Sequence, residues 1–150
     1  MTELIFRNVD VSPEDPVEKW PLEAIQTALE RGSLKHWRRL GAAIKVQPWG
    51  PVARDIEDVL AYSRPYGVAK VMERVIDEAR HSAEAAERTM VASEVRRLVE
   101  QSGLSRNDFA SRIGTSPSRL STYATGKVVP SAAMLVRMHK VADVSNPDDS

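Results

Sequence analysis

Residues 103–127 read GLSRNDFASRIGTSPSRLSTYATGK, a stretch in which helix-starting and helix-ending residue types alternate. Serine caps the first turn of a helix, and glycine ends one because it adopts a left-handed backbone conformation that side chains resist. These types recur here in the order Ser105, Gly114, Ser116 and Gly126. The spacing predicts two short helices, over residues 105–112 and 116–124, joined by a tight turn centred on Gly114.

Apolar residues predict that these two helices pack on a common core. Ala110 is small enough to let them approach closely, and Leu120 and Tyr123 mark the inner face of the second helix. A helix that ends at Gly103 precedes the pair, and Ser131 opens another helix after it. Two short helices connected in this way have the proportions of a helix-turn-helix, in which the second helix enters the major groove of DNA.

With these elements in place, residues 92–142 resemble the Cro and phage-repressor type, or XRE, family of DNA-binding domains. The matching residues are Gly103-Leu104-Ser105, Phe109-Ala110, Ile113-Gly114-Thr115-Ser116, Leu120-Ser121, Gly126-Lys127, Pro130 and the helix from Leu135 to Val141. The resemblance covers about a third of the chain and implies a five-helix-type helix-turn-helix domain. Ala124 departs from the family, which usually has an acidic residue there, and this affects a local contact rather than the fold.

The resemblance also implies which residues contact DNA. Those that would face base edges or the adjoining backbone are Pro117, Ser118, Ser121 and Thr122, with Arg119 beside them. Those that would contact phosphates or cap the first turns of the two helices are Ser105, Arg106, Ser116 and Lys127. Taken singly, the serines that open the helices are ordinary caps and the basic residues are ordinary solvated charges. Their combination at this spacing favours DNA binding.

Charge is divided unevenly along a chain whose formal net charge is zero. Residues 1–88 carry 13 basic and 15 acidic side chains, whereas residues 89–142 carry 8 basic and 3 acidic ones. The net charge of +5 in the second segment suits a phosphate backbone as partner.

Several function classes lack the residues they need. The chain has no cysteine, which excludes disulfides and cysteine-based zinc sites. It has no apolar run of about 20 residues and no visible secretion signal, so we expect a cytoplasmic protein without a membrane partner. Neither a glycine-rich phosphate loop nor a nucleophile-elbow serine is present, so we expect no enzyme and no cofactor. Basic residues surround the row Glu73, Asp77, His81 and Glu84, which favours a solvated helix face over a metal site.

The remaining residues predict further helices and an all-α fold class. Apolar residues recur at helical spacing after Leu22, Ser33 and Pro51, and the lack of glycine and proline over residues 68–102 favours one long helix. Residues 3–11 alone look strand-like, and would pair with a second copy or lie as an arm on the helices. The predicted domains are an N-terminal helical domain (1–82), a helical connector (83–91), the DNA-binding domain (92–142) and a flexible acidic tail (143–150).

Aromatic residues gather in the N-terminal half, at Trp20, Trp37, Trp49, Tyr62 and Tyr66. Such residues are most often part of a core, and a ligand pocket or a partner surface is the alternative. We therefore expect most of these five residues to lie in the core.

These observations favour a sequence-specific transcriptional regulator, acting as a repressor. Because one such module offers few base contacts, we expect a homodimer on a palindromic operator in double-stranded DNA. The alternative is an antitoxin whose N-terminal domain binds a protein toxin and whose helix-turn-helix autoregulates transcription. A third possibility is a small effector bound among the aromatic helices.

Overall fold

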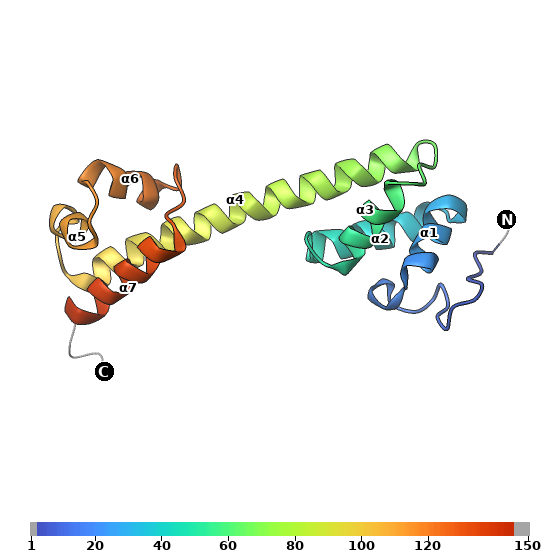
Figure 1. The fold of residues 1–150 in the computed structure, drawn as a ribbon, viewed down its shortest axis with the longest axis horizontal. Coiled ribbons are helices and arrows are strands. Elements are labelled where there is room, and N and C mark those ends of the chain that lie inside the picture. Colours follow the sequence, from blue (N-terminus) through green and yellow to red (C-terminus); the bar gives the residue numbers. More distant parts are fainter. Residues whose placement is uncertain (1–2, 146–150) are drawn as a thin grey trace. The chain divides into compact units, whose positions relative to one another are not determined.

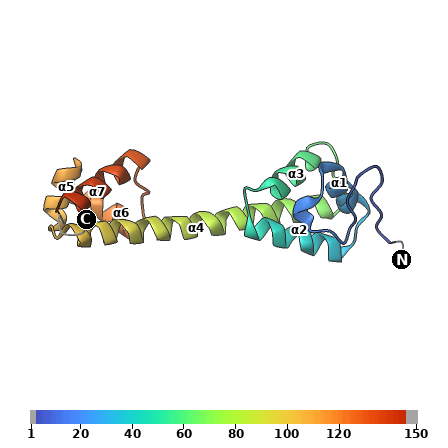
Figure 2. The same ribbon diagram turned by 90° about the horizontal axis from the view of Figure 1, so that it is seen from below.

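The computed structural model of the chain describes residues 3–145. The elements are the 3-10 helix η1 (Val17–Lys19) and the helices α1 (Leu22–Arg31), α2 (Leu34–Val46), α3 (Pro51–Leu60), α4 (Val68–Ser102), α5 (Arg106–Ile113), α6 (Pro117–Thr125) and α7 (Ala132–Ser145). Figure 1 and, turned by 90°, Figure 2 show this order. The described residues contain no strand, which confirms the predicted all-α class. The chain divides into two compact units, residues 1–83 and 84–150.

The N-terminal unit is built from α1, α2, α3 and the first turns of α4 around one apolar core. Each helix contributes residues at helical spacing, and Ile25, Leu29, Leu40, Ile56 and Met72 are among those buried there. Complete burial of one such side chain contributes about 1.5–3 kcal/mol. Burial of these side chains therefore stabilises the unit.

Residues 3–11 form an irregular arm rather than a strand. Leu4 is buried against the helices, and the Phe6 ring meets Trp20 edge-on with the ring centroids 5.0 Å apart. Of the two alternatives that the sequence left open for this segment, the structure shows the arm. Apolar contacts with the helices hold it, and no strand in the described chain pairs with it.

One arginine of α2 holds the segment that follows the arm. Arg39 lies over the Trp20 ring, 5.1 Å from its centroid, and donates from Nη2 to the Asp15 carbonyl at 2.7 Å. Its Nη1 donates to the carbonyl of Pro13. A guanidinium suits this position because its planar fork reaches several acceptors while its face stacks on an aromatic ring.

The expectation that the N-terminal aromatic residues are mostly core is wrong. Trp20 is buried and Trp37 is half-buried, but Trp49, Tyr62 and Tyr66 are exposed. The three exposed rings lie in connections between helices, where no inward-facing helical position buries them.

The predicted long helix is α4, which continues through residues 83–91 without a break. Alanine, glutamate and arginine are frequent in this interval, and all three favour helix. At the other end of the C-terminal unit, α7 runs to Ser145, three residues into the predicted flexible tail. The remainder of that predicted tail, residues 146–150, lies outside the described residues.

Two of the four α4 residues that were weighed as metal ligands have partners within the protein. Glu73 forms an ion pair with Arg64 at 2.6 Å, and His81 Nδ1 lies 2.7 Å from the Asp77 carbonyl oxygen. The hydrogen bond from Arg64 lowers the pKa of Glu73.

Among the described helices, none is long and apolar enough to cross a membrane.

Candidate nucleic-acid interface

The C-terminal unit holds α6 on a scaffold made of α5, α7 and the last turns of α4 (Figure 1). Leu98 of α4, Phe109 and Ile113 of α5, Leu120 of α6 and Met138 of α7 are all buried in one cluster. Helix α5 contacts both α6 and α7, so it joins the helix pair to the rest of the unit.

The turn between α5 and α6 has the predicted chemistry. Ser105 Oγ accepts from the Asp108 amide at 3.1 Å, and Ser116 Oγ accepts from the Arg119 amide at 3.2 Å. Gly114 has φ of +80°, a conformation that favours glycine. The helix caps and the turn glycine are therefore confirmed, with each helix beginning one residue after its capping serine.

Helix α6 has a buried side and an exposed side. Leu120, Tyr123 and Ala124 are buried in the unit core. Pro117, Ser118 and Arg119, by contrast, are exposed, and Ser121 and Thr122 are half-buried. The residues expected to read bases thus include three that the structure leaves open to solvent and two that it partly covers.

The hydroxyl groups of α6 also make contacts within the helix. Ser118 Oγ lies 3.2 Å from the capping Ser116 Oγ, and Thr122 Oγ1 donates to the Arg119 carbonyl at 2.6 Å. A hydroxyl has one donor and two acceptor positions, so Thr122 keeps acceptor capacity while its proton is engaged. Of these two side chains, Ser118 is the more exposed.

The three basic side chains predicted to contact DNA have no charged partner among residues 3–145. Arg106 in the first turn of α5, Arg119 in α6 and Lys127 after α6 are exposed, and no ion pair joins them to any residue within 3–145. Asp108 is the only acidic residue in the stretch 103–127. These three cations can therefore meet an external anion without first breaking an ion pair to a described residue.

Sequence reasoning did not identify the contact that anchors the end of α6. Arg96 of α4 donates from Nη1 to the Ala124 carbonyl at 2.5 Å. This is the position at which the sequence lacks the acidic residue usual in the resembled family. The Ala124 carbonyl lies in the last turn of α6, and a basic residue facing the C-terminal end of a helix is favourable.

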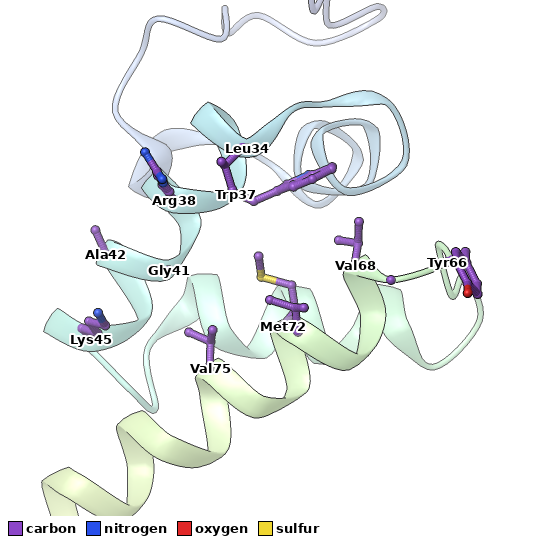
Figure 3. A pocket seen from close by; sticks show the side chains of 12 residues that line it. Leu34, Trp37, Arg38, Gly41, Ala42, Lys45, Tyr66, Val68, Met72 and Val75 are labelled. Carbon is purple, nitrogen blue, oxygen red and sulfur yellow. The ribbon is translucent and has the colours of Figure 1, made fainter.

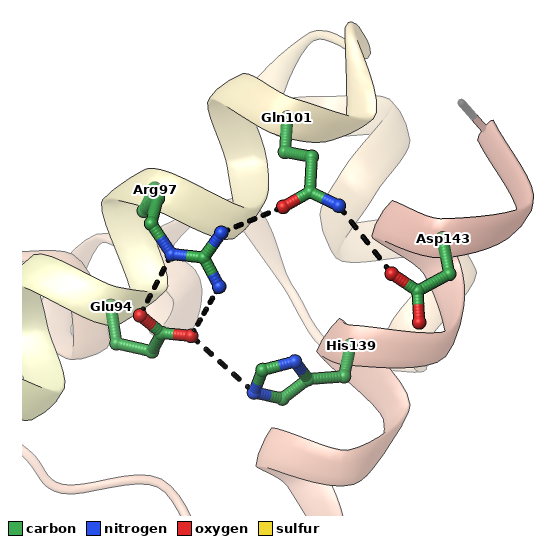
Figure 4. A network of polar contacts seen from close by, with 5 residues as sticks. All are labelled: Glu94, Arg97, Gln101, His139 and Asp143. Carbon is green, nitrogen blue, oxygen red and sulfur yellow. Dashed lines mark hydrogen bonds and ion pairs between the residues drawn. The ribbon is translucent and has the colours of Figure 1, made fainter. Parts of the chain in front are cut away.

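A polar network between α4 and α7 engages other charges of this unit (Figure 4). Arg97 contacts Glu94 at 2.6 Å and Gln101 at 2.8 Å, and His139 Nε2 lies 3.5 Å from Glu94. Gln101 also donates to Asp143 at 3.4 Å. The hydrogen bond from Arg97 lowers the pKa of Glu94. Arg97 is thus committed to the scaffold rather than to a ligand.

Comparison with known proteins identifies the C-terminal region. Residues 91–149 match a protein family described as a helix-turn-helix domain, a family related to the XRE type, and this confirms the resemblance of residues 92–142. No curated protein and no solved structure matches the chain significantly. The N-terminal half has no assignment from these comparisons. A helix-turn-helix domain indicates a DNA-binding regulator.

Proposed function

We propose that this chain, whose residues 91–149 match a helix-turn-helix domain, is a sequence-specific transcriptional regulator that inserts α6 into the major groove. The supporting observation is the two-sided character of α6. Its inner residues are locked in the unit core, while Pro117, Ser118 and Arg119 remain exposed. A short helix held in this way can meet base edges without rearrangement of the scaffold.

The free cations would supply most of the affinity, and the hydroxyls would supply selectivity. Arg106, Arg119 and Lys127 can each neutralise a phosphate, and each such contact contributes about 0.9 to the slope of log K against log salt. Serine and threonine hydroxyls accept from or donate to any base. Their readout is less discriminating than that of an arginine or glutamine, so one copy of α6 would select weakly.

Weak readout by one copy supports the further proposal of a homodimer. A two-fold pair places its recognition helices in successive major grooves, about 34 Å apart, and reads a palindrome. Two copies double the number of base contacts, which brings the affinity into the range typical of specific operators. Occupation of such an operator within a promoter would repress transcription.

Selection of binding sites tests the proposal. The full chain is used to enrich a pool of random duplexes, and the enriched sequence is confirmed by fluorescence anisotropy and footprinting. We expect a palindromic site whose protected bases lie in two major-groove segments. Enrichment of no sequence over the starting pool would contradict the proposal.

Ser118→Ala tests whether the exposed side of α6 reads that sequence. Loss of one hydroxyl contact removes about 0.5–1.5 kcal/mol, so affinity for the selected site should fall several-fold while affinity for random duplex stays unchanged. Ser93→Ala, which removes an exposed hydroxyl from α4, is the matched control. Equal affinity of Ser118→Ala and the control for the selected site would contradict base reading by this side of α6.

A further inference from the structure

The N-terminal unit contains an open groove of about 560 Å³ between α2 and the first turns of α4 (Figure 3). Trp37 and Gly41 of α2 and Met72 and Val75 of α4 line its deeper part. Ligand sites for small molecules have volumes of about 300–1,000 Å³ and mostly apolar walls, so the groove has a suitable size and lining.

Both walls of the groove present apolar surface to solvent. Leu34 of α2 is 56 % exposed and Val71 of α4 is 55 % exposed. The indole N–H of Trp37 donates to the Ala28 carbonyl at 2.9 Å, so this ring offers the groove an apolar surface rather than a donor. Exposed apolar residues that line one groove are typical of a ligand-binding or protein-binding site.

The charged residues of the groove are all basic. Arg38 and Lys45 line it, and none of its lining residues is acidic. Neither side chain forms an ion pair with any residue that the structure describes. They lie seven residues apart in α2, which is about two turns or 10 Å along the helix.

The basic character belongs to α2 specifically. This helix carries four basic residues and no acidic one, although residues 1–83 as a whole hold 12 basic and 13 acidic side chains. Arg39 is engaged with the N-terminal segment, whereas Arg38 and Lys45 face solvent at the groove. An apolar groove with unpaired cations on one wall is complementary to a molecule that is apolar along its length and anionic at one end.

We propose that this groove binds a small amphipathic carboxylate. The acyl or aryl body lies along Trp37, Met72 and Val75, and the carboxylate meets Arg38 or Lys45. This proposal does not depend on DNA binding by α6, so it can be tested whether or not an operator is found. It gives the N-terminal unit the role of a ligand-binding domain.

Two other occupants fit the observations less well. A second copy of the chain, docked symmetrically through this groove, would bring the cations of two α2 helices together, and like charges at an interface are unfavourable. A stable protein partner needs about 20–30 residues on each side, whereas the groove has 12 lining residues. The hollow that continues beyond Lys45 and Val75 contains Glu78, so the anion-compatible surface ends there.

Titration of the full chain with monomeric dodecanoate tests the proposal. Binding is followed by tryptophan fluorescence and by isothermal titration calorimetry, with dodecanol and dodecyltrimethylammonium as probes of the same chain length. We expect dodecanoate to bind at least roughly ten-fold more tightly than either probe, because only the carboxylate forms charge-assisted hydrogen bonds.

Matched variants locate the site. Arg38→Ala with Lys45→Ala should weaken dodecanoate binding roughly ten-fold or more, whereas Lys35→Ala on the same helix should leave it unchanged. Val71→Glu should abolish binding by placing an anion at the rim, and Val46→Glu, which alters an exposed residue of α2 outside the groove, should not. All of these positions except Val71 lie in α2, and all are exposed, so the variants should fold.

Three results would overturn the proposal. Equal affinity for dodecanoate and dodecyltrimethylammonium would show an apolar patch without anion recognition. Binding of anionic phosphatidylglycerol vesicles without binding of monomeric dodecanoate would assign the surface to a membrane. Dissociation of a dimer by Val71→Glu in sedimentation velocity, with no ligand bound by the wild-type chain, would assign it to a second copy.

Discussion

Arg106 is the side chain for which the DNA-binding proposal makes its simplest prediction. It is exposed in the first turn of α5, has no charged partner in the described chain, and follows the helix cap at Ser105. Arg106→Ala should weaken binding to every duplex alike and should reduce the slope of log K against log salt by about 0.9 for each chain bound. Anisotropy titrations at several salt concentrations measure this slope.

Lys140→Ala is the matched control for Arg106→Ala. It removes one exposed positive charge from the same unit, in α7 rather than in the helix pair. If both variants lower the slope equally, the unit attracts DNA through its net charge alone, and Arg106 has no specific phosphate contact.

The residues of the candidate site differ in how far the sequence could predict them. The capping roles of Ser105 and Ser116 depend on bonds to amides three residues away, so the local sequence carries enough information. The contact from Arg96 to the Ala124 carbonyl joins residues 28 positions apart. Local spacing does not reveal such a contact, and only the packing of α4 on α6 brings its partners together.

Helix α2 offers a test of how one side chain controls the stability of an element. Its N-terminus has a capping arrangement in which the Ser33 amide donates to His36 Nδ1 at 3.0 Å. Burial, followed by the charges of Lys35 and Arg39, lowers the pKa of His36 below its ordinary value of 6.5. The neutral ring accepts this bond, so its stabilisation is complete above pH 6.5 and is lost as the pH falls through the folded-state pKa.

His36→Gln should remove this pH dependence while keeping an acceptor at the third position of the helix, where glutamine serves in capping boxes. Between pH 7.5 and pH 5 the wild-type chain should lose on the order of 0.5–1 kcal/mol more stability than the variant. Chemical unfolding followed by circular dichroism measures the difference. Parallel stability curves for the two chains would show that His36 does not control the cap.

The elements of the N-terminal unit were predictable where their signals are local. Apolar residues at helical spacing and the breaks at Gly32, Pro48 and Gly67 delimit α1 to α4 within a few residues. The arm at residues 3–11 was ambiguous because β-branched and aromatic residues suit both a strand and a docked segment. The groove between α2 and α4 could not be foreseen, because it depends on how two helices pack rather than on either one.

Along the whole chain, the excess of basic residues falls in the segment that contains the helix-turn-helix. The formal net charge of zero is the sum of −2 over residues 1–88, +5 over residues 89–142 and −3 over residues 143–150. The basic segment includes α5, α6 and the turn between them. Electrostatic attraction to a phosphate backbone is therefore expected from residues 89–142, which include the helix-turn-helix, while the N-terminal unit is close to neutral.

The number of chains on one operator is the prediction that tests the proposed assembly. Because a single α6 presents few base-reading side chains, one chain should bind a selected site weakly and two chains should bind it tightly. Sedimentation velocity of the complex should give two chains per duplex, and scrambling one half-site should weaken binding roughly 100-fold or more, since each lost base pair removes about 1–3 kcal/mol. A complex of one chain per duplex, unaffected by the second half-site, would refute the dimer and leave α6 to act alone. In that case the specificity would have to come from DNA shape at positions that α6 does not touch.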